Sequence, residues 1–143
     1  MRKLLSLITV VGVAAAVAVP ATAGAANDNL RVFVSNCAKQ VYKPKQITVA
    51  CADAGIIISK VKYSSYGAKT AKGTGTAAVN LCDPNCAAGK TKRFPVKFTL
   101  SKVTQCGDSY QFRRLTLTYT KATPPHSKKT IVQPYVCADA PTA

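Results

Sequence analysis

The sequence contains no tryptophan and no glutamate, and it has one histidine and five aspartates against twenty lysines and arginines. The shortage of carboxylates and imidazoles removes most of the side chains from which catalytic acid–base pairs and metal sites are built. Strong helix formers are also scarce, and no helical repeat of apolar residues follows the N-terminal segment. These absences argue against a helical fold, a metal centre and an enzyme.

The one long hydrophobic run lies at the N-terminus. Two basic residues precede an uncharged apolar stretch from Leu4 to Val19, and a proline and small residues follow it. This is the layout of a secretory signal peptide, and the stretch is shorter than the roughly 20 residues of a membrane-spanning helix. We expect a signal peptide over residues 1–25, cleaved after a residue between 23 and 26. The remainder, 26–143, should form a single secreted β-domain without a transmembrane segment.

All six cysteines lie beyond this leader, and an even number in a small exported chain is typical of a disulfide framework. Cys82 and Cys86 stand close together, but a zinc site needs about four converging ligands, and redox centres prefer C-x-x-C at a helix start. We therefore expect structural disulfides and neither metal nor cofactor. The cysteines concerned are Cys37, Cys51, Cys82, Cys86, Cys106 and Cys137. Among the pairings we favour Cys37 with Cys137, which leaves Cys51 and Cys106 to bond the two cysteines of the 82–86 turn.

Short segments in which apolar and polar residues alternate make up most of the chain after the leader, as in β-strands. The apolar phase slips by one residue near Ser59 and again at Arg113–Arg114, where a bulge or a change of sheet would keep both sets facing a core. About seven short strands predict an all-β fold, a small antiparallel β-sandwich of immunoglobulin-like or Greek-key type, stapled by disulfides. The segments are 30–35, 46–51, 55–67, 94–101, 109–120 and 129–137, with 70–80 as a weaker edge strand or bulge whose backbone packs closely.

The charge balance points to acidic partners. Without the leader, eighteen basic residues face five aspartates, a net charge of about +13, and such a field attracts anions in a salt-dependent way. The alternative interpretation is a solvated surface that keeps the protein soluble. Basic residues occupy several outward positions that alternate with the inward-facing apolar residues of the predicted strands. We therefore predict a candidate anion-binding face made of Lys60, Lys62, Lys97, Lys102 and Arg114.

Phosphate-bearing or uronic polymers of a cell envelope are the anions available outside a cell. Nucleic acid fits less well, because Tyr42 and Tyr66 are the only evident aromatic residues outside the predicted core that could stack on bases.

No catalytic residue is expected. His126 lies in a proline- and lysine-rich loop, and Asp53, Asp83 and Asp108 lie in turn sequences where an aspartate bonds its own backbone. The chain contains no nucleophile elbow, phosphate-binding P-loop or zinc-protease helix motif. An enzyme would require Asp53, Asp83 or His126 to meet in one cleft.

Several motifs together resemble a family of small exported actinobacterial proteins of uncharacterised function. They are CADAG (51–55), YSSYGAKTAKGTG (63–75), NLCDPNCAAG (80–89), FPVKFTLS (94–101) and LTLTY (115–119). The chain departs from the family pattern at Tyr63 and Tyr66, where tryptophan is usual, and at Leu81, where aspartate is usual. The resemblance implies export and a shared β-fold, and it brings no activity with it.

The sequence thus predicts a monomeric, non-catalytic, secreted β-domain, loosely associated with the cell wall, that binds anionic cell-envelope polymers. The alternative is an inhibitor or binding partner of an extracellular protein such as a hydrolase. That second class would use an exposed rigid loop such as 83–91, and its binding would survive salt that releases a polymer.

Overall fold

The computed structural model of the chain describes residues 30–51 and 55–138, which contain eight β-strands and no helix. The predicted leader, residues 1–25, lies outside the described residues. The strands are β1 (Val32–Asn36), β2 (Lys39–Val41), β3 (Ile47–Thr48), β4 (Ile56–Tyr66), β5 (Ala71–Asn80), β6 (Thr91–Cys106), β7 (Ser109–Tyr119) and β8 (Thr130–Pro134). The all-β prediction is confirmed, and β2 has no counterpart among the predicted segments.

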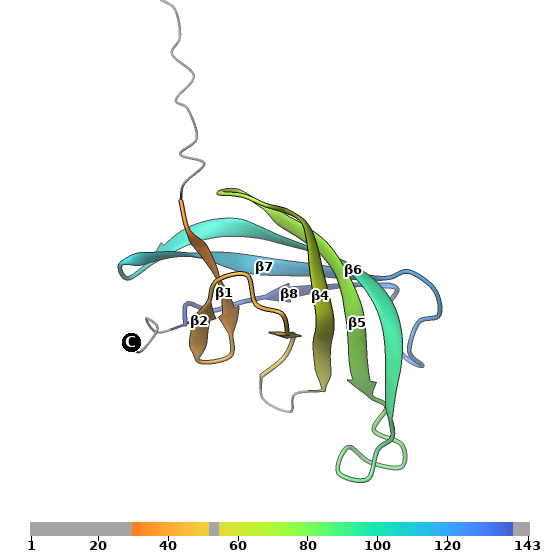
Figure 1. Ribbon diagram of the computed structural model, residues 1–143. Coiled ribbons are helices and arrows are strands. Elements are labelled where there is room, and N and C mark those ends of the chain that lie inside the picture. The colour runs from red at the N-terminus through yellow and green to blue at the C-terminus, as the bar shows by residue number, and fades with distance from the viewer. Residues whose placement is uncertain (1–29, 52–54, 139–143) are drawn as a thin grey trace, which may run out of the picture.

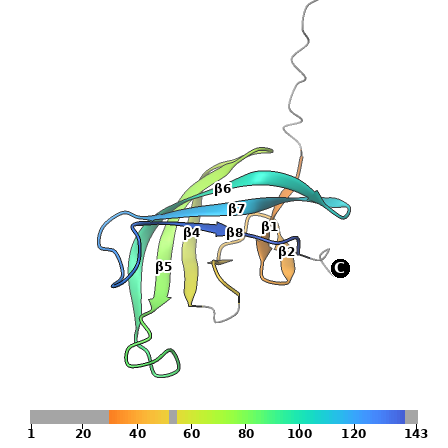
Figure 2. The ribbon, with the colours of Figure 1, turned by 180° about the vertical axis from the view of Figure 1, so that it is seen from behind.

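Hydrogen bonds join all eight strands into one mixed sheet. The order is β2-β1-β7-β6-β5-β4-β3, and β8 pairs with β7 beyond the end of β1. Neighbouring strands run antiparallel except β1 and β7, which are parallel. The predicted sandwich is therefore not fully confirmed, because a single curled sheet encloses the core (Figures 1 and 2).

The two ends of the curled sheet meet where β1 approaches β3. The side-chain oxygen of Asn36 accepts a hydrogen bond of 2.9 Å from the amide of Thr48, and its amide group donates one of 3.4 Å to the carbonyl of Gln46. A disulfide between Cys37 and Cys51 adds a covalent link across the same junction. Side chains rather than a continuous strand ladder thus hold the curl.

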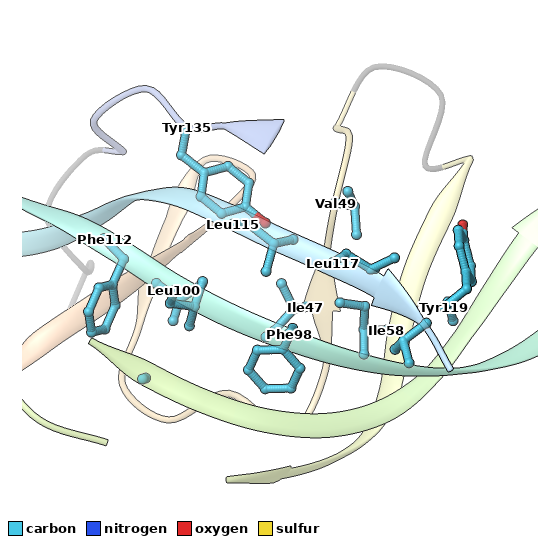
Figure 3. Packing of buried hydrophobic residues seen from close by; sticks show 14 of the residues in the cluster. Ile47, Val49, Ile58, Phe98, Leu100, Phe112, Leu115, Leu117, Tyr119 and Tyr135 are labelled. Atoms are coloured by element: carbon cyan, nitrogen blue, oxygen red, sulfur yellow. The ribbon is translucent and has the colours of Figure 1, made fainter. Parts of the chain in front are cut away.

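The core lies on the inner face of the curl (Figure 3). Alternation along β6 buries Phe94, Val96, Phe98 and Leu100, as predicted for residues 94–101. From β7, Leu115, Leu117 and Tyr119 fill the same space and have no exposed surface. Burial of apolar surface contributes roughly 25 cal/mol per Å², so this inner face supplies most of the folding free energy.

Both predicted phase slips occur. In β4 the register shifts between Ser59 and Lys62, with Lys60 in the left-handed region at φ 52°, so residues on both sides of the slip face the core. In β7, Phe112 and Leu115 are both fully buried although three positions separate them. At this point β7 exchanges its neighbour β1 for β8 within the same sheet, so the slip marks a change of strand partner and not the predicted bulge or change of sheet.

The segment expected to be an edge strand, residues 70–80, is instead a central strand. As β5 it pairs with β4 along one side and with β6 along the other. The expectation of close backbone packing is confirmed at Gly73, where an added Cβ would lie 2.5 Å from the carbonyl oxygen of Lys62 and 2.7 Å from the Phe98 ring. The glycines and alanines of β5 leave room for the strand to pass between bulky neighbours. The same small side chains make its apolar pattern weak.

The six cysteines form three disulfides, but the predicted pairing is wrong. The bonds join Cys37 to Cys51, Cys82 to Cys86, and Cys106 to Cys137. Cys37 and Cys137 lie near opposite ends of the chain that follows the predicted leader, yet the sheet determines which cysteines are close in space. Cys37 directly follows β1 and lies beside the segment after β3, whereas the β6–β7 hairpin brings Cys106 to the C-terminal segment.

Buried glutamines hold that C-terminal segment in place. The Gln111 amide donates to the carbonyl of Ala138 (2.9 Å) and accepts from its backbone amide (3.0 Å). Gln40 donates to the same carbonyl (3.0 Å) and accepts from the hydroxyl of Ser109. Arg113 adds a bond to the carbonyl of Tyr135. Each buried amide is therefore paired, which offsets the cost of its burial.

Candidate functional site

Nearly all charged side chains on the described surface are basic. Eighteen of the twenty lysines and arginines lie in the described part of the chain, and the carboxylates there are Asp83 and Asp108. Asp83 follows β5, and Asp108 lies in the β6–β7 hairpin, so both are at the ends of strands. On the face of the sheet that points away from the core, the polar side chains of the central strands are mainly lysines and threonines.

Strand register brings two of the predicted cations together. Thr74 of β5 pairs with Lys62 of β4 on one side and with Lys97 of β6 on the other. All three side chains are exposed and alternate with buried neighbours such as Phe98. Strands lie about 4.8 Å apart, so the backbones of the two lysines are roughly 10 Å apart with a hydroxyl between them.

The next row of the sheet adds a cation that sequence reasoning missed. Lys72 pairs with Thr99, which in turn pairs with Thr116. A shallow hollow of about 380 Å³ lies over these two rows, and its lining includes Lys72, Thr74, Lys97 and Thr99. Lys72 and Thr74 alternate around Gly73, and this period of two was the signal that could have identified Lys72. We call Lys62, Lys72, Thr74, Lys97, Thr99 and Thr116 the outer face.

Of the other predicted cations, Arg114 lies on the same side of the sheet. It pairs with Ser101 in the row next to the one that holds Thr99 and Thr116. Lys60 and Lys102 are exposed at irregular positions of their strands, with φ values of 52° and 61°. Three of the five predicted cations, Lys62, Lys97 and Arg114, thus lie on one side of the sheet, and their order follows from strand neighbours that period-2 reasoning does not specify.

The hydroxyl groups of Thr74, Thr99 and Thr116 make no hydrogen bond within the described residues, whereas that of Thr118 contacts Thr130 (3.2 Å). Free hydroxyls can donate to anionic oxygens, and lysine ammonium groups supply charge-assisted donors beside them. The outer face can thus bind phosphate or carboxylate groups at several points.

The tyrosines considered for stacking on ligands have structural roles. Tyr66 is half-buried, packs edge-on against Phe112 with ring centroids 5.7 Å apart, and donates a 2.6 Å hydrogen bond to the carbonyl of Val32. Tyr63 donates to the carbonyl of Pro44 (3.0 Å). Burial raises the pKa of Tyr66 to about 12, and it raises the pKa of Tyr63 as well. The prediction that Tyr66 lies outside the core is therefore wrong, and of the two tyrosines predicted to lie outside it only Tyr42 is exposed.

Two groups named for a hypothetical enzyme do line one hollow. Asp83 and His126 both border a space of about 290 Å³ between the β5–β6 and β7–β8 loops. Both are exposed and form no hydrogen bond with each other, so the base-orienting contact of a catalytic pair is lacking. Asp53 lies outside the described residues. Among the residues described, no group of three histidine, cysteine or acidic side chains converges as a metal site would require.

No protein family model, curated protein or solved structure matches the chain. The resemblance to small exported actinobacterial proteins thus stays a prediction that rests on its motifs. In residues 30–51 and 55–138 there is no helix of the length and apolarity needed to cross a membrane. Three disulfides are compatible with an extracellular location, since such bonds persist in oxidising compartments.

Proposed function

We propose that this protein is an exported, monomeric, non-catalytic β-domain that binds anionic polymers of the cell envelope through its outer face. The observation that supports this best is the row in which Lys62 and Lys97 flank Thr74, with Lys72 in the next row. None of the residues of this face is acidic. Export is proposed from the N-terminal leader and agrees with the disulfides.

A polymer suits this surface better than a small anion. The cations are spread over three strands on an exposed, shallow face, so no single point encloses a ligand. A chain of regularly spaced phosphates or carboxylates could instead contact several of them at once, and multiple weak contacts add up to useful affinity. The face carries no aromatic side chain, which disfavours single-stranded nucleic acid.

The test compares two double variants of equal charge. Lys62→Gln/Lys97→Gln removes the row on the outer face, and Lys39→Gln/Lys45→Gln removes two exposed cations near β2 and β3. The probes are immobilised polyphosphate and polygalacturonate, with retention measured as salt is raised. We expect wild type to bind at low salt and elute as salt screens the charges, and the outer-face variant to elute earlier than its control.

Equal elution of the two variants would show that net charge alone drives retention and would refute the role of the outer face. Retention that is indifferent to salt would refute anion binding altogether. The same elution series on isolated cell envelopes extends the test to the native polymer.

A further inference from the structure

The loop between β5 and β6, residues 81–90, contains the longest run of exposed residues in the described part of the chain. Every residue from Cys82 to Ala88 is exposed. The loop extends beyond the ends of the strands as the green hairpin in both ribbon views (Figures 1 and 2). It contributes no residue to the buried core apart from the partly buried Leu81 at its start.

A network of local bonds nevertheless fixes the shape of this loop. The Asn80 side chain donates to the carbonyl of Cys86 (2.7 Å) and accepts from the amide of Cys82 (3.0 Å). The side-chain oxygen of Asn85 accepts from the amide of Ala88 (2.9 Å). The disulfide between Cys82 and Cys86 closes the same small ring. The loop is thus braced by bonds among its own residues and by Asn80, the last residue of β5.

Packing inside the loop is tight as well. A Cβ added at Gly89 would lie 2.2 Å from the side-chain oxygen of Asn80, 2.8 Å from the carbonyl oxygen of Asn85 and 2.9 Å from the amide nitrogen of Cys82. Only glycine fits there, because all three neighbours belong to the network that holds the loop. Because close packing and hydrogen bonds fix the shape of this exposed loop before it meets a partner, the loop is pre-organised. A pre-organised loop loses little conformational entropy on binding.

A second loop lies beside it and widens the surface. Pro125 and His126 of the β7–β8 connection line the same hollow as Leu81, Cys82 and Asp83. The amide of Ser127 donates to the carbonyl of Pro124 (3.2 Å), which closes a turn in this loop. The two loops thus form one continuous surface at this end of the molecule.

The chemistry of this surface differs from that of the outer face. Its tip carries small, uncharged side chains at Pro84, Asn85, Ala87 and Ala88 beside the carboxylate of Asp83, whereas exposed lysines lie at the base of the loop and in the second loop, at Lys90, Lys92 and Lys128. A narrow tip with one charge fits into a concave site, and the cations at the base of the loops favour acidic groups around the mouth of that site.

We propose that the braced β5–β6 loop, with the adjoining Pro125–His126 turn, is a protein-binding site that inserts its tip into an acidic-rimmed cleft of an extracellular protein. This site is distinct from the outer face and does not depend on polymer binding. The alternative predicted function is an inhibitor or partner of an extracellular protein, and this loop surface is the one that would serve it.

The experiment begins with immobilised full-length mature protein and culture fluid of the producing organism at about 0.5 M salt, where exposed charges act over only a few ångströms. A captured protein is purified, and its affinity is measured for wild type and three variants. Ala87→Arg places a bulky side chain on the exposed tip, Cys82→Ser/Cys86→Ser loosens the loop, and Lys62→Gln/Lys97→Gln serves as a control on the outer face. Circular dichroism verifies that each variant is folded.

We expect one-to-one binding, a loss of about thirtyfold or more in affinity with Ala87→Arg, as at a binding hot spot, and a smaller loss with the loosened loop. The outer-face variant should bind as wild type does, and hydrogen exchange should show protection at 82–88 and 124–127 in the complex. The proposal is overturned if no protein is captured at this salt, if Ala87→Arg binds normally, or if protection maps to another surface. Loss of binding in the outer-face variant alone would also overturn it, and would assign the captured protein to the other site.

Discussion

A disulfide holds the C-terminal segment, and another holds the β5–β6 loop. The bonds that hold the C-terminal segment join residues far apart in the sequence, whereas the bonds that hold the loop join residues only a few positions apart. Gln40 reaches Ala138 across 98 positions, and Cys106 bonds Cys137 across 31. In the loop the disulfide spans four positions and the Asn80 bonds span two and six. Long-range links restrict the unfolded chain and stabilise the fold, whereas short-range links mainly define the shape of a surface.

The largest effect should follow removal of the long-range disulfide. Cys106→Ser/Cys137→Ser is expected to lower the free energy of unfolding by about 3–4 kcal/mol, because the bond closes a long loop in the unfolded chain. Urea denaturation of the purified variant measures this. A loss below about 1 kcal/mol would mean that the glutamine contacts alone hold the C-terminal segment.

Next in size is the effect of the buried glutamine. Gln111→Leu leaves the amide of Ala138 without its acceptor, while the carbonyl keeps its bond to Gln40. An unpaired buried donor should cost about 2–3 kcal/mol. The matched control is Gln105→Leu, at an exposed position that bonds only the carbonyl of Gly107 (3.2 Å), and it should change stability by less than about 0.5 kcal/mol. Similar costs for the two variants would contradict the structural importance assigned to Gln111.

A smaller loss of stability is expected when the local disulfide is removed. Cys82→Ser/Cys86→Ser should cost less than about 2 kcal/mol, since the closed loop is short. Limited proteolysis should nevertheless cut the loop much faster than in wild type, while urea unfolding shifts little. A variant as resistant to proteolysis as wild type would show that the Asn80 bonds suffice to order the loop.

Loss of one hydroxyl tests the attachment of β4 to β1. Tyr66→Phe removes the hydrogen bond to the carbonyl of Val32 and should cost about 1 kcal/mol at neutral pH. Tyr110→Phe, at a side chain that is 37% exposed, is the control and should be near neutral. Chemical denaturation of the two proteins side by side distinguishes these outcomes.

The effect of pH should be absent at neutrality and appear only in alkali. Burial raises the pKa of Tyr66 to about 12 and also raises the pKa of Tyr135, above the value near 10 of an unfolded tyrosine. The neutral forms stabilise the fold fully below about pH 10, and this contribution is lost as pH rises toward 12. Tyrosinate absorbance and circular dichroism, followed together from pH 9 upward, should show buried rings ionising as the fold is lost. Ionisation of all rings without unfolding would contradict their burial.

Local features of the fold could be predicted from the sequence because they depend on near neighbours. Alternation identified most strands, and the slip at Ser59 correctly marked a shift of register in β4. At Arg113 the strand β7 changes its neighbour without the predicted bulge or change of sheet. The position of β5 could not be predicted, since its alanines and glycines give a weak apolar pattern although Ala71 and Ala77 are fully buried.

Long-range features were beyond such reasoning. The disulfide pairing and the grouping of cations both follow from which strands are adjacent, and sequence spacing does not contain that information. Lys72 was missed because its strand was assigned to an edge, while Lys60 and Lys102 were included although both lie at irregular positions. The rigid loop was identified correctly as exposed, but its internal support by Asn80 shows only in the structure.

The parallel pairing of β1 with β7 has a consequence for how the chain can acquire its fold. Val32 pairs with Tyr110 and Val34 with Phe112, so the first strand finds its place only when most of the described chain is available. Contacts of such wide separation slow folding, because the intervening chain must be ordered before they form. A chain shortened to end before β7 would keep the antiparallel strands β4, β5 and β6 but would leave β1 paired with β2 alone, so the place of the first strand in the sheet depends on β7.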